Sequence, residues 1–454
     1  MTTLLCKRIL FLSKRIKRLT KKLIGGGRMN AMSSNKTFMD KIGIPSNLTW
    51  GYIGIIVFMI GDGLEQGWLS PYLVEKGLTL EHAAFLFTIY GITVSASSWF
   101  SGVFVQMWGP RKVMTFGLVS FILGSIGFIG IGIQHMNYPV IIICYALRGF
   151  GYPLFAYSFL VWVSYSTPQQ MLSRAVGWFW FVFQLGLSVI GAFYSSYMVP
   201  KIGEIATLWS ALIFVVVGGL FSIVVNKDKF KAQTVSANKS SELLKGITIA
   251  FEHPKVGIGG IVKIINSAAQ FGFVVFLPTY MMKYNFTMTE WLQIWGTLFF
   301  VNMVFNIIFG IVGDKFGWVN TIKWFGGVGC GIVTLALYYV PQMVGHNYWA
   351  ILFVACCYGA TLAGYVPLTA LVPSLSPENK GAAMSVLNLG SGLSAFVGPL
   401  VVTAFIGPLG VGGVMWIFAG LYFFGAFLTH FLTIPKENGM QQDLNAKSGE
   451  QFSV

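Results

Sequence analysis

Charged side chains are scarce in this 454-residue chain: Asp, Glu, Lys and Arg together make up 10% of it, against 55% hydrophobic residues. A soluble domain carries about a quarter charged residues, because it needs a wetted surface. The mean hydropathy is +0.71, and there are too few polar residues to cover a water-soluble globule. The composition therefore predicts an all-α membrane protein whose outer surface faces lipid.

Motifs for chemistry on a substrate are missing as well. No Gly-Lys-Ser or Gly-Lys-Thr occurs, which excludes a P-loop ATPase motor. The His residues form no HExxH pair, and the five Cys residues show no CxxC spacing. We therefore expect no enzyme activity, no cofactor, no bound metal and no disulfide framework.

The chain does contain apolar runs long enough to cross a membrane. About 20 mainly apolar residues span the hydrocarbon core as a helix. The twelve predicted spans are 50–74, 83–107, 113–133, 139–164, 175–199, 205–226, 257–282, 290–313, 319–340, 347–372, 381–406 and 411–434. They predict a basic N-terminal arm (1–45), a six-helix bundle (46–226), a central loop (227–256), a second six-helix bundle (257–434) and a tail (435–454).

The net charge of +15 follows the predicted topology. With the N-terminus in the cytoplasm, the cytoplasmic segments hold 24 of the 30 Lys and Arg residues, and the outside loops keep only Lys76, Lys201 and Lys283. This asymmetry is the positive-inside rule. The basic charge therefore predicts two cytoplasmic termini, and we expect no nucleic-acid partner.

The two predicted bundles contain related motifs. Residues 102–109 (GVFVQMWG) recur 208 positions later as 310–317 (GIVGDKFG), in each case between the second and third span of a bundle. Residues 135–138 (HMNY) are matched by 346–348 (HNY). A repeated half with a site at mid-membrane between the copies is the architecture of many secondary transporters.

The arm 1–45 holds eleven Lys or Arg residues and a single acid. Its apolar residues recur every three or four positions, which is typical of a helix that lies on an anionic membrane surface. The alternative is an over-extended reading frame whose true start is Met29 or Met32. The sequence leaves both explanations open.

Four ionisable side chains stand out inside the predicted spans, where a charge costs at least about 2.5 kcal/mol at the helix centre. They are Asp62, Glu65, Arg148 and Lys263. Asp62 and Glu65 are three residues apart and would share one helix face. Arg148 would pair with one of them, and burial beside a like charge favours protonation of the other. We expect these three residues to couple transport to protons; the alternative is a fixed ion-pair cluster that only orients the first and fourth spans.

Neutral polar and aromatic side chains inside the spans are candidate solute ligands. Amides both donate and accept hydrogen bonds, so they suit a solute rich in hydroxyl groups. Helix–helix hydrogen bonding or packing is the alternative for each of them, and Lys263 could instead extend its ammonium to water. The candidate substrate-binding set is Trp180, Gln184, Lys263, Asn266, Gln270, Asn302, Tyr365 and Asn388.

The repeated motif resembles the signature of the major facilitator superfamily, found in its loops 2–3 and 8–9. The resemblance implies a gating role for Gly102, Gly109, Arg111, Gly310, Asp314 and Gly317. Further runs resemble the bacterial ribitol and arabinitol permeases over residues 45–434. They are 61–65 (GDGLE), 148–155 (RGFGYPLF), 177–180 (GWFW), 264–266 (IIN), 290–295 (EWLQIW) and 380–388 (KGAAMSVLN).

The resemblance implies a twelve-helix major facilitator fold with two pseudo-symmetric bundles, alternating access, and proton-linked pentitol uptake by a monomer in the bacterial inner membrane. Gln106 departs from the pattern, because the first copy of the signature usually has an acid there. One rival is a transporter of an organic anion, including a carboxylate siderophore, with Arg148 and Lys263 binding the carboxylates. Another is a membrane receptor that binds solute without transporting it.

Overall fold

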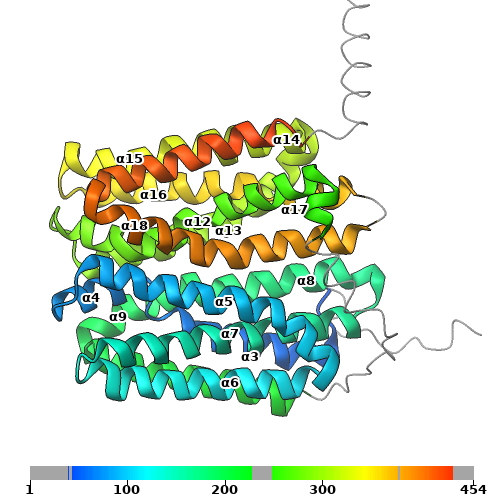
Figure 1. The fold of residues 1–454 in the computed structure, drawn as a ribbon, viewed down its shortest axis with the longest axis horizontal. Helices are drawn as coiled ribbons and strands as arrows, with labels where there is room; N and C mark the ends of the chain where they lie inside the picture. Colours follow the sequence, from blue (N-terminus) through cyan, green and yellow to red (C-terminus); the bar gives the residue numbers. More distant parts are fainter. Residues whose placement is uncertain (1–38, 40–42, 227–247, 377–378, 433–454) are drawn as a thin grey trace, which may run out of the picture.

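The computed structural model describes residue 39 and residues 43–226, 248–376 and 379–432. The regular secondary structure of these residues is entirely helical. Figure 1 shows two stacked groups of helices with roughly parallel axes, which we call the N-half (46–225) and the C-half (254–429). The predicted tail, nearly all of the predicted basic arm and most of the predicted central loop lie outside the described residues.

The N-half contains eight α-helices, several of them continued by a π-helical segment. In chain order, after the short turn η2 (Ser46–Leu48), these elements are α3 (Thr49–Gly63), α4 (Leu69–Glu75), α5 (Leu80–Trp108), α6 (Pro110–Gly127), η3 (Phe128–Ile133), α7 (Tyr138–Ser166), α8 (Gln169–Gln184), η4 (Leu185–Ile190), α9 (Gly191–Ile202), α10 (Glu204–Leu220) and η5 (Phe221–Val225).

The C-half is built in the same way. Its elements are α12 (Pro254–Met282), α13 (Met288–Phe316), α14 (Trp318–Thr321), η6 (Ile322–Gly329), α15 (Cys330–Val344), α16 (Tyr348–Leu362), η7 (Ala363–Tyr365), α17 (Leu368–Ser374) and α18 (Lys380–Thr429).

Ten of the described helices are long and apolar enough to cross a membrane. One of them, α18, covers the last two predicted spans, and it is kinked at Gly410, whose φ is 63°. The first predicted span, 50–74, consists of α3 and α4 joined by a turn at residues 64–68. Each predicted span therefore falls on helical residues, but the prediction of one continuous helix over 50–74 is wrong.

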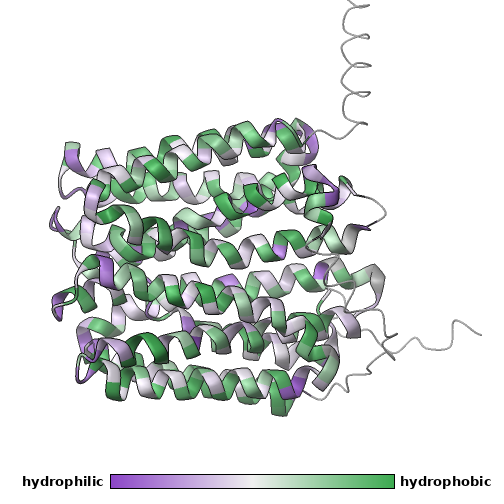
Figure 2. Cartoon of the chain, in the orientation of Figure 1, coloured by the Kyte–Doolittle hydropathy of each residue, from purple (hydrophilic) through white to green (hydrophobic). Residues whose placement is uncertain are grey.

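The outer surface of the helices is apolar. Ile307 and Phe353 each expose 70% of their surface, which is expected where a side chain faces lipid. Figure 2 shows hydrophobic residues along the lengths of the helices and hydrophilic residues gathered mainly at their two ends. This distribution matches a bundle whose middle lies in hydrocarbon.

The repeated motif has the same backbone in both halves. Gly109 joins α5 to α6 with φ 81°, and Gly317 joins α13 to α14 with φ 90°. Positive φ is a conformation that glycine adopts without a steric penalty, so glycine at both positions permits the sharp turn between two long helices. The repeat in the sequence is thus a repeat in structure.

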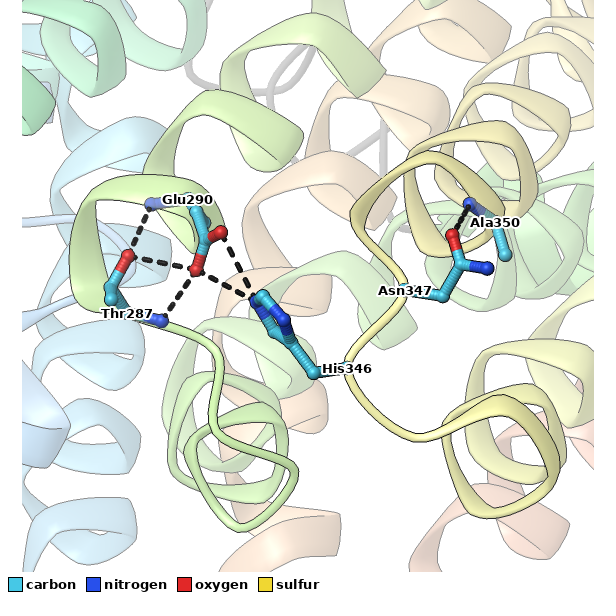
Figure 3. Close-up of polar contacts among 5 residues, drawn as sticks. All are labelled: Thr287, Glu290, His346, Asn347 and Ala350. Carbon is cyan, nitrogen blue, oxygen red and sulfur yellow. Dashed lines mark hydrogen bonds and ion pairs between the residues drawn. The ribbon is translucent and has the colours of Figure 1, made fainter.

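The matched HMNY and HNY runs begin equivalent helices. Asn137 caps α7 by accepting a hydrogen bond from the backbone N–H of Val140 at 3.4 Å. Asn347 caps α16 in the same way, accepting from Ala350 at 3.1 Å (Figure 3). Such a cap satisfies one of the free N–H groups at a helix start, which gives the repeated Asn a structural role.

The C-half has an additional contact at this end. Thr287 and Glu290 form a capping box at the start of α13, and the imidazole Nε2 of His346 lies 3.1 Å from a Glu290 carboxylate oxygen (Figure 3). Both side chains are partly exposed. An exposed pair of this kind contributes about 0–1 kcal/mol; its main effect is to join the start of α13 to the loop before α16.

The two halves meet along α5 and α18, with α4 packed on α12 and α9 packed on α13. Hydrogen bonds that cross this interface include those from Ser70 Oγ to the Val275 carbonyl at 2.5 Å, between Thr88 Oγ1 and Thr403 Oγ1 at 2.9 Å, and from Ser95 Oγ to the Gly392 carbonyl at 2.8 Å. Ser70 lies on α4, and Thr88 and Ser95 lie on α5, between the predicted outer end of that helix and its middle.

Candidate functional site

Two oppositely charged side chains pair inside the N-half. The Arg148 Nη1 on α7 donates to the Glu65 Oε2 at 2.5 Å, and the exposed fractions of Arg148 and Glu65 are 2% and 3%. Glu65 lies in the turn between α3 and α4, where the broken helix brings its side chain towards α7. The sequence left open which acid faces Arg148, and in the structure it is Glu65.

Arg148 is also enclosed by aromatic rings. Its guanidinium carbon lies 4.8 Å from the ring centre of Phe121, 5.5 Å from that of Phe128 and 5.3 Å from that of Tyr145. Cation–π contacts of this kind stabilise a desolvated cation. The Arg148 Nε has no hydrogen-bond partner among the described residues, so Glu65 and the rings are what hold this charge in place.

Asp62 has a different environment. It lies near the end of α3 with 4% of its surface exposed, and its Oδ1 accepts a hydrogen bond from the Tyr90 hydroxyl at 3.1 Å. Within the described part of the chain, Asp62 forms no ion pair. The site therefore contains one compensated and one uncompensated carboxyl group.

Both acids border a small cavity of about 40 Å³ between the halves, which we call the carboxylate cavity. The N-half contributes Asp62, Glu65, Gln66, Phe87, Tyr90, Val94, Tyr145, Tyr152 and Leu187, and the C-half contributes Phe271, Val274, Ala395 and Pro399. Because both halves form its walls, a rocking movement of one half against the other would change access to Asp62.

A larger cavity of about 230 Å³ also lies between the halves, and we call it the serine-lined cavity. Its polar lining consists of Ser95, Ser98, Trp99, Ser101, Tyr157, Trp180, Ser385, Asn388 and Ser391. Among the described residues, none that lines it is charged. Its lining reaches Gly102 near the end of α5 and Ser385 near the start of α18, which are the ends predicted to be cytoplasmic.

Two of the predicted solute ligands, Trp180 and Asn388, line the serine-lined cavity. Three others have contacts elsewhere. Asn302 Nδ2 donates to the Gly359 carbonyl at 3.0 Å, joining α13 to α16. Gln184 Nε2 donates to Ser188 Oγ at 2.7 Å within its own span. Tyr365 is buried inside the C-half.

The remaining three predicted ligands follow one face of α12. Lys263 and Gln270 are partly exposed and Asn266 is buried. None of the three lines the carboxylate cavity or the serine-lined cavity. Lys263 packs against α18, because a Cβ atom placed on Gly390 would lie 3.2 Å from the Lys263 Cβ. Gly390 lies between two lining residues of the serine-lined cavity, Leu389 and Ser391.

The polar residues of the gating motif make contacts within their own half. Arg111 Nη2 donates to the Asn226 carbonyl at 2.5 Å, and its guanidinium lies 5.3 Å from the Trp162 ring centre. Asp314 accepts from Trp318 Nε1 at 3.1 Å. Gly310 has open space beside it, since a Cβ atom on this residue would have no described atom within 4 Å.

Sequence reasoning missed the hydroxyl groups of the site. Tyr90, the partner of Asp62, was not singled out, and neither were the cavity residues Ser95, Ser98 and Ser101. A signal for the serines was present, since residues three apart on a helix share a face. Their regular spacing along α5 marks the polar stripe that faces the other half.

Comparison with known proteins gives a consistent family. The sequence pattern of the Major Facilitator Superfamily matches residues 51–372 and 325–451. An alpha-ketoglutarate permease of Bacillus subtilis (strain 168) is 66% identical over 411 residues, covering 90% of this chain and 94% of that protein. A ribitol transporter and a D-arabinitol transporter of Klebsiella pneumoniae are 38% and 36% identical, covering 89% and 91% of this chain and 96% and 98% of those proteins.

The fold has a counterpart among solved structures. The crystal structure of a D-xylose-proton symporter superposes with a TM-score of 0.64 at 14% sequence identity, covering 84% of this chain and 95% of that chain. The predicted resemblance to the polyol permeases is confirmed, and so is the predicted fold class.

Proposed function

This chain belongs to the Major Facilitator Superfamily and is a multi-pass secondary transporter, not an enzyme, and we propose that it couples uptake of a small organic acid to protons. The solute class we favour is that of the 2-oxo dicarboxylates. The transporter would work as a monomer in the cytoplasmic membrane by alternating access, with both termini in the cytoplasm. The observation that carries the proposal is the buried Asp62, which forms no ion pair within the described residues and borders a cavity walled by both halves.

The coupling site follows from the different partners of the two acids. An ionised carboxylate at Asp62 would be a buried charge without an ion-pair partner among the described residues, and such a charge costs several kcal/mol. A proton on Asp62 removes that cost, whereas Glu65 already has Arg148 at 2.5 Å. Asp62 is therefore the residue that would load and release the proton, and the Glu65–Arg148 pair would hold the surrounding helices.

The proposed solute class rests on the relatives and on one cationic side chain, that of Lys263. The relative with 66% identity is an alpha-ketoglutarate permease. Arg148 is paired with Glu65, so it is a poor candidate for a solute carboxylate. Lys263 is partly exposed, has no ion pair within the described residues, and packs beside the α18 segment that borders the serine-lined cavity. Its ammonium would bind one carboxylate, and the serine hydroxyls would bind oxygen atoms of the rest.

A specific observation supports a second candidate, the polyols. The polar groups in the described lining of the serine-lined cavity, which also contains Leu160, Val161 and Leu389, are hydroxyl, amide and indole groups without a charge. Such groups suit a solute rich in hydroxyl groups. The ribitol and D-arabinitol transporters at 38% and 36% identity are of this kind. The two candidates differ in whether they need Lys263.

The test is uptake by the purified protein in liposomes with an imposed pH gradient. Labelled 2-oxoglutarate and labelled ribitol are compared, each with and without the unlabelled other solute as a competitor. The proposal predicts accumulation of 2-oxoglutarate that collapses with a protonophore. Accumulation of ribitol alone would select the polyol candidate, and binding without accumulation of any solute would indicate a receptor.

A pair of lysine variants then tests the proposed ligand. Lys263→Met should raise the KM for 2-oxoglutarate by about tenfold or more, since a hydrogen bond to a charged group contributes about 1.5–3 kcal/mol. Lys323→Met is the matched control, because Lys323 lies over the Trp324 ring at 5.3 Å in the same half and should leave uptake unchanged. Equal KM values for the Lys263 variant and the wild type would contradict the assignment.

A further inference from the structure

The carboxylate cavity is too small for a solute. Its volume is about 40 Å³, against about 230 Å³ for the serine-lined cavity. About 10–15 Å³ of cavity volume is enough to hold one water, and a buried water needs two to four polar partners. The carboxylate cavity has such partners in Asp62, Tyr90 and Tyr152, so it can hold one water or a few. The proton and the solute would therefore occupy different compartments.

A row of tyrosines leads from one cavity towards the other. The Tyr90 hydroxyl donates to Asp62, and the ring centre of Tyr90 lies 6.3 Å from that of Tyr152, with the two rings nearly parallel. Tyr152 lines the carboxylate cavity, and its ring centre lies 6.2 Å from that of Tyr157. Tyr157 lines the serine-lined cavity. Tyr152 and Tyr157 therefore form the boundary between the two cavities.

The packing around this row fixes its geometry. The Phe183 ring centre lies 6.3 Å from that of Tyr152 and 6.1 Å from that of Tyr157, which gives both rings an apolar neighbour on the α8 side. Tyr157 and Ser98 both line the serine-lined cavity, so the row of tyrosines ends at a polar wall of the larger compartment.

We propose that Tyr152 and Tyr157 relay the proton between Asp62 and the serine-lined cavity, an inference that rests on the proposed proton coupling. In each step a hydroxyl oxygen accepts a proton from the preceding group and gives its own proton to the next acceptor. One proton leaves the Asp62 carboxyl, one proton reaches water in the serine-lined cavity, and both phenols are regenerated when their hydroxyls rotate back. The net change is an ionised Asp62 and a hydrated proton.

The experiment compares two transport modes in Tyr152→Phe and Tyr157→Phe liposomes. Gradient-driven uptake requires a proton to be loaded and released in every cycle. Counterflow, the exchange of labelled external solute for unlabelled internal solute, only requires the loaded carrier to reorient. A relay role predicts that gradient-driven uptake and solute-induced proton flux fall at least about tenfold in each variant, as for loss of a proton-transferring side chain. Counterflow should stay close to the wild-type rate in Tyr152→Phe, because Tyr152 lines the carboxylate cavity and not the serine-lined cavity.

The control is Tyr194→Phe. Tyr194 is a tyrosine of α9 in the same half, its hydroxyl donates to Ser210, and it lines neither cavity; both transport modes should be unchanged. Equal loss of both transport modes in the Tyr152 and Tyr157 variants would indicate a structural role and overturn the relay. Proton flux at the wild-type rate in both variants would overturn it as well. If the wild-type protein itself moves no protons with its solute, the proposed coupling fails as well, so the two failures can be told apart.

Discussion

Arg148 in the N-half and Tyr358 in the C-half occupy equivalent places. Each lies eleven residues after the asparagine that caps its helix, from 137 to 148 on α7 and from 347 to 358 on α16. Arg148 forms the buried ion pair with Glu65, whereas the Tyr358 hydroxyl shares a 2.6 Å hydrogen bond with the Tyr422 hydroxyl. The same helix position therefore carries a charge in one half and a neutral pair in the other, and the proposed proton site belongs to the N-half.

Replacing Asp62 by Asn should separate coupling from translocation. The amide resembles the protonated carboxyl in shape and lacks its titration, so Asp62→Asn should abolish accumulation driven by a pH gradient and keep counterflow. Glu75→Gln is the matched control, because Glu75 is an exposed acid at the end of α4 and should behave as the wild type. Gradient-driven accumulation in the Asp62 variant would refute the assignment of Asp62 as the proton site.

The Glu65–Arg148 pair should behave as a unit in stability measurements. Removing one partner of a buried pair leaves an uncompensated charge, which costs about 3–5 kcal/mol. Both Glu65→Gln and Arg148→Met should therefore lower the Tm of the detergent-solubilised protein, and the double variant should lose less than the sum of the two single losses. The measurement is thermal unfolding of all four proteins. Additive losses would mean that the two side chains do not depend on each other.

The helical architecture could be predicted from the sequence because each span is a long apolar run bounded by charge or by turn residues. Gly109 and Gly317 were visible as a repeat, and both adopt positive φ. The break in the first span was not predictable from local pattern, since its turn is held in part by a contact with a helix far away in the sequence. The Leu64 carbonyl, which the break releases from the helix, accepts hydrogen bonds from Trp68 Nε1 and from Ser195 Oγ on α9, both at 2.5 Å.

The site was predictable only in part. Asp62, Glu65 and Arg148 stand out in any membrane span because buried charges are rare there. Neutral polar residues carry a weaker signal, because an amide that bridges two helices and an amide that binds a solute look the same in a sequence. Asn302 bridges α13 and α16, while Asn388 lines the serine-lined cavity, and only the tertiary packing distinguishes them.

These two asparagines should give opposite results when replaced by alanine. Asn302→Ala removes the donor to the Gly359 carbonyl and should cost about 1–3 kcal/mol of stability, with an unchanged KM for the solute. Asn388→Ala should raise the KM and leave the Tm close to that of the wild type. Parallel thermal unfolding and initial-rate uptake measure both quantities. A lower Tm without a KM change in Asn388→Ala would remove that residue from the solute site.

The turn between α3 and α4 should control closure of the interface. A Cβ atom on Gly67 would lie 3.3 Å from both Trp291 Nε1 and Leu292 Cδ2 in the C-half. Gly67→Ala should therefore push the halves apart at this end and favour the state that is open there. A spin-label pair at positions 76 and 283, on the loops predicted to lie outside, should report a longer distance.

Gly77→Ala is the control for backbone strain in this experiment. Gly67 and Gly77 have similar φ values, 93° and 103°, but a Cβ atom on Gly77 would have no atom within 4 Å. A residue other than glycine pays about 1–2 kcal/mol in a left-handed conformation, so both variants should lose similar stability, and only Gly67→Ala should lengthen the distance between the labels. An equal change in both variants would show that strain in the turn, and not contact with Trp291, shifts the equilibrium between the two states.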